Sequence, residues 1–322
     1  MNLVESTPAT ERFLEQWNDG NDYITAHTSG STGKPKEIRL LKSDMLVSAS
    51  ATCSFFGITG DSMLVCPLSA DYIAGKMMIV RAISSGATLA MTNPSNRPDL
   101  TRFDNIDLLP VVPSQIEGIL ADRTNIDRIG NLLVGGGKTA EGAEILLNES
   151  GIPSWASYGM TETCSHVAVR PLGNPSSPYT ALPGIIFDTD TDNCLKIISE
   201  NFSWNVMQTN DIIDLIDNRS FKWLGRRDNV INSGGIKIIP ETVEQKIADL
   251  IDRPFYITGA PDPKWGEKVI LFIESRCQID TVRLADAISH AVLPHERPKE
   301  IITVERFERT LSDKIKRKII TS

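Results

Sequence analysis

The chain has 322 residues, a net charge of −8 and a pI of about 5.2. This length suits about two or three domains, and a 41% share of apolar residues can build sizeable cores. The acidic balance excludes a general basic field that would attract nucleic acid or anionic lipid, so a polyanion would have to bind at a local site.

The five cysteines are scattered without a close pair, which favours neither a disulfide framework nor a zinc site. The N-terminal segment lacks a basic stretch followed by an apolar one, and no apolar run approaches the roughly 18 residues of a membrane helix. We therefore expect a cytoplasmic protein that is neither exported nor inserted into a membrane.

The first part of the chain alternates between helical and extended patterns. An amphipathic helix is predicted over 7–18, a strand over 23–29 that runs into a glycine-rich loop, and a strand over 37–41. Between 42 and 150, helical patterns alternate with short apolar runs at 62–68, 87–91, 107–112 and 131–137. This alternation predicts a layered α/β domain that contains parallel strand pairs.

The second part begins with a β-rich subdomain, predicted over about 183–224 from short strands and turns. Glycines and charges interrupt the pattern over 225–235. A compact α+β segment follows, with helices near 240–252 and 280–292, strands at 255–260 and 269–275, and a basic tail. We place a domain boundary at about Asp228, which gives domains of 1–227 and 228–322.

The glycine-rich loop, "TSGSTGKPK" over 28–36, has the composition of a phosphate site, because glycines let backbone N–H groups approach oxygens and hydroxyls add donors. It is not the P-loop pattern, since two residues separate its glycines and Pro35 pushes Lys34 toward a strand. A solvated hairpin loop is the alternative. The candidate phosphate contacts are Thr28, Ser29, Gly30, Ser31, Thr32, Gly33 and Lys34, with added charge from Lys36.

Four motifs in order, at 28–36, "YGMTET" (158–163), "GRRDNVINSGGIKIIPETVE" (225–244) and "RTLSDKIKR" (309–317), resemble those of the acyl-adenylate-forming superfamily. That family contains acyl- and aryl-CoA synthetases, luciferases and the adenylation domains of peptide synthetases. The resemblance runs from about residue 24 to the C-terminus. It implies a large layered α/β N-terminal domain, truncated relative to the family, with a β-rich subdomain and a small α+β C-terminal domain on a hinge.

The resemblance implies an ATP site in which Tyr158 stacks on adenine, Asp211 and Arg226 hold the ribose, and Glu162 ligates Mg²⁺. Gly136 and Gly159 would allow close backbone packing around the nucleotide, and Thr161 would donate to the α-phosphate. The family's usual Thr-Gly-Asp is Thr209-Asn210-Asp211 here. Asparagine tolerates left-handed backbone geometry, so we expect this turn to survive the change.

The resemblance also implies a mobile C-terminal domain. Asp228 corresponds to the hinge, and Lys314 to a lysine that stabilises the charge developing as pyrophosphate leaves. The family usually has glycine before this lysine, where this chain has Asp313. Lys316 is therefore a competing candidate, and a solvated basic tail is the alternative to both.

The segments 111–120, 158–170 and 231–244 are most similar to those of ligases that act on o-succinylbenzoate. On this similarity, Ser114, Ser165 and His166 are candidate contacts of the aromatic acid and its second carboxylate, and His166 has a packed or solvent-facing histidine as its alternative. Arg170, Tyr72 and Lys76 are further candidates.

The expected function is an ATP-dependent acid–thiol ligase that uses Mg²⁺ and CoA, forms an acyl-AMP and then an acyl-CoA thioester, and acts on an aromatic carboxylate. We expect no nucleic-acid partner, and the oligomeric state, with a homodimer among the options, stays open. Two alternatives also stay open, an adenylating enzyme that loads another acid onto CoA or a carrier protein, and a non-catalytic nucleotide-binding protein.

Overall fold

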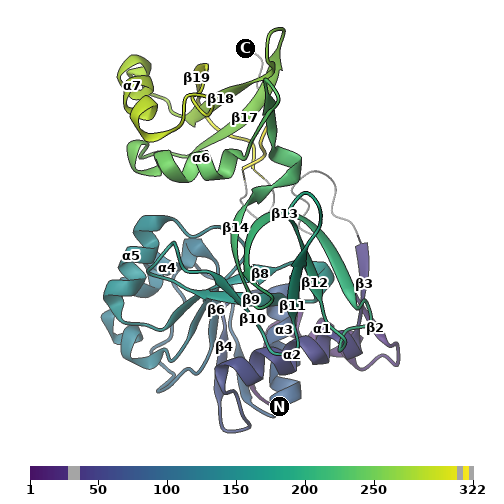
Figure 1. Ribbon diagram of the computed structural model, residues 1–322. Helices are drawn as coiled ribbons and strands as arrows, with labels where there is room; N and C mark the ends of the chain where they lie inside the picture. The colour runs from purple at the N-terminus through teal and green to yellow at the C-terminus, as the bar shows by residue number, and fades with distance from the viewer. Residues whose placement is uncertain (28–36, 310–314, 319–322) are drawn as a thin grey trace.

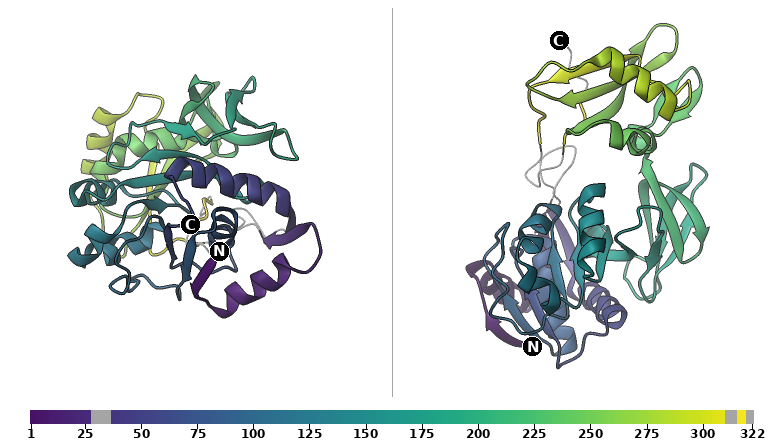
Figure 2. Two further views of the ribbon diagram at one scale, coloured as in Figure 1. Left: turned by 90° about the horizontal axis from the view of Figure 1, so that it is seen from below. Right: turned by 90° about the vertical axis from the view of Figure 1, so that its left-hand side faces the viewer.

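The computed structural model describes residues 1–27, 37–309 and 315–318. The chain forms a large unit, from the N-terminus to strand β14, and a small unit from strand β15 onward, with the junction at Arg227–Asn229 (Figure 1). The right-hand view of Figure 2 shows the small unit, in yellow and light green, above the large one.

The helices of the large unit cover its sheets, and two further helices pack on the small unit (Figure 1). The α-helices are α1 (Pro8–Trp17), α2 (Lys42–Phe56), α3 (Ile73–Ser85), α4 (Pro113–Leu120), α5 (Glu141–Ser150), α6 (Pro240–Ile247) and α7 (Thr281–Ala291). The 3₁₀ turns are η1 (Arg123–Arg128), η2 (Thr161–Thr163), η3 (Arg227–Asn229) and η4 (Ala248–Leu250). Within the described ranges, no helix combines the length and apolarity needed to cross a bilayer.

The large unit is built on a parallel sheet that meets a longer, mixed one. Three parallel strands pair in the order β1 (Asn2–Glu5), β5 (Thr88–Met91), β4 (Met63–Cys66). Next to β4, the backbone N–H of Val65 donates to the carbonyl of Leu108 at 3.3 Å, just before the mixed sheet begins. The predicted parallel pairing and layered α/β class are thereby confirmed.

The mixed sheet has nine strands and unites the α/β region with the β-rich region. Its order is β11 (Ile186–Thr189), β12 (Cys194–Ile198), β13 (Val206–Asp217), β14 (Ser220–Arg226), β10 (Tyr179–Ala181), β9 (His166–Pro171), β8 (Ser154–Gly159), β7 (Leu132–Val134) and β6 (Leu109–Val111). Pairing is parallel from β6 to β8 and antiparallel from β8 onward. The change of sequence texture near 183 therefore falls within one continuous sheet, after the pairing has already become antiparallel at β8–β9.

The small unit has a five-stranded sheet of its own. Its strands are β15 (Ile231–Ser233), β16 (Ile236–Ile238), β17 (Phe255–Asp262), β18 (Gly266–Glu274) and β19 (Glu300–Val304). The predicted strands and the helix near 280–292 are present. Helix α6 ends at Ile247, five residues earlier than predicted, because the last residues tighten into the 3₁₀ turn η4.

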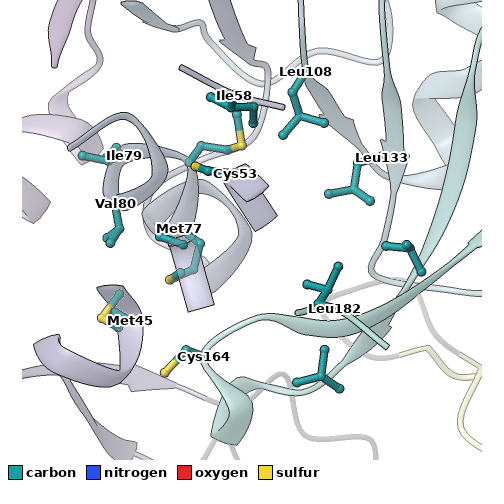
Figure 3. Packing of buried hydrophobic residues seen from close by; sticks show 14 of the residues in the cluster. Met45, Cys53, Ile58, Met77, Ile79, Val80, Leu108, Leu133, Cys164 and Leu182 are labelled. Carbon is teal, nitrogen blue, oxygen red and sulfur yellow. The ribbon is translucent and has the colours of Figure 1, made fainter. Parts of the chain in front are cut away.

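Helix α3 lies at the centre of the large unit and is buried almost all round, which is typical of a core helix without a solvent face. It packs against α2, and side chains such as Met45 and Met77 gather with Leu133 of the sheet (Figure 3). The buried residues of the small unit form separate clusters, centred on residues such as Val243 and Leu271.

A core prediction follows from strand β4. Leu64 is fully buried, so Leu64→Ala should lower the free energy of unfolding of the large unit by about 3 kcal/mol through lost transfer energy and a cavity. The same truncation at the exposed Leu146 of α5 should change it by less than about 0.5 kcal/mol. Urea denaturation followed by tryptophan fluorescence measures both, and equal effects would contradict the burial described.

Candidate active site

The edge of the sheet formed by the carboxyl ends of β6, β7 and β8 brings together residues from three separate segments. These strands are adjacent and parallel, so their carboxyl ends meet at one edge, the usual ligand position in an α/β sheet. Ser114 follows β6 and is exposed, Gly136 follows β7, and Gly159 ends β8. Gly136 has φ +80°, and a Cβ there would lie 3.2 Å from Val112 Cγ1, so the first two segments touch.

The glycine-rich loop joins two strands that pair with each other. Strands β2 (Tyr23–His27) and β3 (Glu37–Leu41) are antiparallel, with His27 opposite Glu37. The prediction that a strand, and not a helix, follows Lys34 is confirmed by β3. The candidate phosphate contacts Thr28, Ser29, Gly30, Ser31, Thr32, Gly33 and Lys34, with Lys36, lie outside the described residues.

Gly159 is required by a close crossing of β8 over the start of β9. A Cβ at this position would lie 2.2 Å from the carbonyl oxygen of Ser165 and 2.5 Å from the Cα of His166. Contacts this short with backbone atoms do not occur in folded proteins, so a side chain here would push the two strands apart. The absence of a side chain thus allows the next four residues to turn sharply at the sheet edge.

That turn is η2, which carries Thr161 and Glu162. Thr163 braces it, because its hydroxyl oxygen accepts from the N–H of Met160 at 3.1 Å and lies 2.7 Å from the Ser165 carbonyl. Cys164 closes the turn with φ +62°, a strained value for a residue other than glycine. Thr161 is half-buried and the Glu162 side chain is exposed, so the carboxylate is accessible to a ligand at this edge.

Asp211 joins strands β8, β13 and β14 through its carboxylate. It is 7% exposed and accepts hydrogen bonds from the Tyr158 hydroxyl at 2.6 Å and from Trp223 Nε1 at 3.2 Å, and the Arg226 guanidinium lies 3.6 Å away. Desolvation, followed by the Asp211 charge, raises the pKa of Tyr158 well above its ordinary value, so the phenol remains a donor. Each carboxylate oxygen keeps a free lone pair, which leaves Asp211 able to accept from a ligand hydroxyl.

The ring of Tyr158 is fixed by other aromatic rings. It meets Phe221 edge-on, with centroids 5.1 Å apart, and lies tilted against Tyr179 at 5.6 Å. Tyr158 is half-buried at the end of β8. The ring is therefore held in place by packing before any ligand arrives.

The Thr209-Asn210-Asp211 segment differs from the expected turn. It lies inside strand β13, and Asn210 does not have the left-handed backbone that we expected to be needed there. The ladder pairs Asp211 with Arg226, so the segment is extended. Asparagine is accommodated here because an extended backbone accepts any side chain.

The candidates Ser165 and His166 are linked to a buried arginine that we did not predict. Arg81 of α3 is 2% exposed and donates through Nη2 to Ser165 Oγ at 2.8 Å, and the same nitrogen lies 3.4 Å from His166 Nδ1. Its Nε is buried without a hydrogen-bond partner, and no carboxylate pairs with it among the described residues. The available signal was a single arginine within the apolar helix pattern "IAGKMMIVRAISS".

The polar contacts of His166 fix its tautomer. A guanidinium can only donate, so Nδ1 faces Arg81 as an acceptor, and Nε2, 3.3 Å from Thr52 Oγ1, carries the proton. Thr52 in turn donates to the Ser48 carbonyl at 3.1 Å. Burial, followed by the Arg81 charge, lowers the pKa of His166 well below its ordinary value, so the ring is neutral. His166 is thus a packed histidine that supports Arg81.

The three remaining acid-binding candidates lie in different surroundings. Arg170 forms a two-pronged ion pair with the buried Glu144, including a 3.1 Å contact from Nη1, so its charge is already paired. Tyr72 is exposed before α3. Lys76 is buried with its ammonium 5.1 Å from the Phe13 ring centroid, and burial lowers the pKa of this lysine.

Lys314 lies outside the described residues, but the chain on either side of it is firmly held. Arg309 bridges to Ile315, and the backbone N–H of Lys316 donates to the Glu308 carbonyl at 2.9 Å. Arg317 then forms two hydrogen bonds of 2.7 Å to Glu244 of α6. Arg309 and the residues from Ile315 to Arg317 are therefore held on the small unit.

Comparison with known proteins gives a consistent picture. The sequence profile of a family described as AMP-binding enzyme matches residues 4–193. A 2-succinylbenzoate–CoA ligase of Listeria monocytogenes is 26% identical over 98% of this chain and 73% of its own length, and one of Bacillus subtilis is 24% identical over 90% and 67%.

Two solved structures share the fold. An AMP-forming acyl-CoA synthetase/AMP-acid ligase II-like protein of Dyadobacter fermentans is 35% identical, covers 96% of this chain and 92% of its own, and superposes with a TM-score of 0.65. The o-succinylbenzoate CoA synthetase of Bacillus subtilis, solved with the acyl-adenylate OSB-AMP, has a TM-score of 0.79 at 22% identity, covering 91% of this chain and 67% of its own.

The crossing at Gly159 gives a testable consequence. Gly159→Ala should weaken ATP binding at least about tenfold, because the new methyl group displaces the β9 backbone and with it the η2 turn. Isothermal titration calorimetry measures the affinity, and a melting curve checks that the variant folds.

Gly142→Ala is the matched control, because a Cβ in that part of α5 meets nothing within 4 Å. We expect it to leave ATP affinity unchanged and to raise stability slightly, by up to about 1 kcal/mol. Unaltered ATP affinity in Gly159→Ala would show that the crossing does not shape the site.

Proposed function

Because the chain belongs to the AMP-binding enzyme family, we propose that its sheet edge binds ATP and an aromatic acid with two carboxylates, and joins that acid to CoA. The curated relatives are CoA ligases, and the chain is accordingly an AMP-forming acid–CoA ligase. The finer proposal is that the acid is o-succinylbenzoate. The observation that carries it is the buried cation of Arg81 beside Ser165, which is paired with no carboxylate of the residues that the structure describes.

Three groups at the sheet edge support the nucleotide assignment. Tyr158 presents a braced aromatic ring for adenine, and Asp211 with Arg226 presents an acceptor and a donor for the ribose. Thr161, Gly136 and Gly159 lie on the same edge, where backbone can approach phosphates closely. In the proposal, the loop over 28–36, which connects β2 to β3, binds the phosphates of ATP.

Glu162 suits Mg²⁺ because it is an exposed carboxylate on a braced turn. No group of three or more metal-ligating side chains occurs in the part of the chain that the structure describes, which agrees with an ion held mainly by nucleotide phosphates. When bound, Mg²⁺ would neutralise phosphate charge. The protein's share is to hold the Glu162 carboxylate at this edge.

The acid assignment rests on the electrostatics around Arg81. Burial lowers the pKa of this guanidinium to about 10, so it remains charged at neutral pH. A buried charge without an opposite partner is costly, and an anionic ligand would offset the cost. Ser165 is half-buried and directly bonded to Arg81, so it carries this positive field toward the sheet edge. A monocarboxylic acid, whose only carboxylate faces ATP, would have no second carboxylate to interact with the positive charge of Arg81.

In the proposed reaction, an oxygen of one substrate carboxylate attacks the α-phosphorus of ATP, and pyrophosphate leaves with the electrons of the broken P–O bond. Lys314 stabilises the charge on the leaving group. The sulfur of CoA then attacks the acyl carbon, AMP leaves, and the thiol proton passes to solvent. For the second step, we propose that the domain from 228 onward rotates about Asp228.

The first experiment is a substrate panel. Pyrophosphate release from ATP and Mg²⁺ should occur with o-succinylbenzoate, and the product with CoA should be its thioester by mass. Benzoates and indoleacetate, the acid named for another relative, should react at least about 100-fold more slowly as kcat/KM. Turnover of another acid with a carrier-bound thiol would replace the substrate assignment, and no turnover at all would favour a nucleotide-binding protein.

Arg81→Met isolates the proposed carboxylate recognition. It should raise KM for o-succinylbenzoate about 100-fold, since losing the buried charge that acts on the acid through Ser165 costs about 3 kcal/mol, and leave KM for ATP unchanged. Lys76→Met is the matched control. It also removes a buried cation from α3, but the ammonium of Lys76 faces the ring of Phe13 and not Ser165. Equal effects of the two variants would mean that Arg81 supports the helix only.

The proposed division of labour between Lys314 and Asp228 predicts opposite defects. Lys314→Ala should abolish pyrophosphate release but largely spare thioester formation from supplied acyl-adenylate, because the lysine acts only on the first leaving group. Asp228→Pro should spare the first step and block the second, since proline restricts rotation at the hinge. Rapid-quench assays of each half-reaction measure both, and parallel losses in the two variants would contradict the rotation.

A further inference from the structure

The side chain of Asn210 bonds to the two residues at which the large unit gives way to the small one. Its Oδ1 accepts from Arg227 Nη2 at 2.6 Å, and its Nδ2 lies 3.3 Å from each carboxylate oxygen of Asp228. A guanidinium only donates and a carboxylate only accepts, so these partners also fix which way the amide points. Both partners belong to the single turn η3, which follows the end of β14 (Figure 1).

We infer that Asn210 is a positioning residue that clamps the hinge in the arrangement seen here, and so sets how often the small unit rotates. The inference rests on the proposed rotation about Asp228. In that rotation the Asp228 carboxylate must move relative to β13, and the bonds to Asn210 must break. A glycine at this position, as in the family pattern that the chain resembles, has no side chain with which to make them.

Neighbouring ion pairs also stabilise the junction between the two units in this arrangement. Arg226 Nη2 donates to Asp228 at 3.1 Å, and Arg227 Nη1 lies 3.8 Å from Asp190. Asp192, on the same β11–β12 turn, pairs with Lys237 of the small unit at 3.2 Å. These ion pairs are largely exposed and contribute little singly. Asn210 differs because one neutral amide engages both hinge residues at once.

The hydrogen bonds of Asn210 form without backbone strain. Asn210 lies within β13 and is outside the left-handed region, so its truncation to alanine removes the amide without relieving strain or adding freedom. Burial lowers the pKa of Lys138, beside the glycines that follow β7, and the charges of Glu244 and Arg317 in the small unit act on this pKa in opposite directions. Because Glu244 and Arg317 of the small unit act on this sheet edge in the arrangement seen here, we assign it to the adenylation step.

The test measures the position of the small unit directly. Spin labels are placed at Cys277, which is exposed in the small unit, and at Ser176→Cys in an exposed turn of the large unit, while the other four cysteines are buried. Asn210→Ala should increase the population of distances that differ from the main wild-type distance by about three- to tenfold, the effect of losing hydrogen bonds to charged groups. Circular dichroism confirms that each variant is folded.

Asn218→Ala is the matched control. Asn218 lies at the opposite end of the same strand pair, in the β13–β14 turn, and its exposed side chain makes no described hydrogen bond. Its distance distribution should match the wild type. An Asn210→Ala distribution that also matches the wild type would overturn the clamp.

The half-reactions provide the functional readout. In Asn210→Ala, the rate of thioester formation from supplied acyl-adenylate, divided by the rate of adenylation, should rise by about three- to tenfold. A merely structural role would lower both rates together and leave the ratio unchanged, which would also overturn the inference. A change in the distances is independent of which acid is the substrate, so failure of the substrate proposal and failure of the clamp are separable.

Discussion

The carboxylate of Asp211 is the interaction on which the geometry of the sheet edge depends. It receives the hydroxyl of Tyr158 from β8 and the indole N–H of Trp223 from β14, and it lies beside the guanidinium of Arg226. A buried carboxylate is tolerated because hydrogen bonds and a nearby cation offset its desolvation. One side chain therefore fixes the aromatic ring, the ends of two strands and the start of the junction between the two units.

A buried and a half-buried arginine show how the same residue type serves different purposes. Arg170 is neutralised by Glu144 and stacks near Tyr179, so it stabilises the packing of α5 on the sheet. Arg81 has only neutral partners among the described residues, Met78, Ser165 and His166. The charge of Arg170 is satisfied within the fold, whereas Arg81 has no anionic partner among the described residues, and this difference is the basis of the proposed role of Arg81 in substrate choice.

The sequence was sufficient to predict most secondary-structure elements and to select the candidate residues that lie in motifs. Strong periodicity predicted α1, β2, β3, β17 and β18, and the order of motifs indicated the family. What it could not provide is pairing at a distance. The continuity of the nine-stranded sheet depends on which strand lies beside which, and the neutral surroundings of Arg81 depend on α2, α3 and β9 meeting. Asn210 was noticed as a departure from a pattern, but its partners follow in the sequence by seventeen and eighteen residues and are brought close only by the β13–β14 ladder.

The two units keep their apolar cores apart, and this shapes how the molecule loses its structure. Among the described residues, the buried clusters of the small unit share no member with those of the large unit. The two units meet where α6 packs against β14 at Gly225. Folding cooperativity is transmitted through shared buried contacts, so the units can melt as separate foldons. An unfolding curve for this protein then contains two transitions, and a ligand that spans the sheet edge and the small unit would merge them into one.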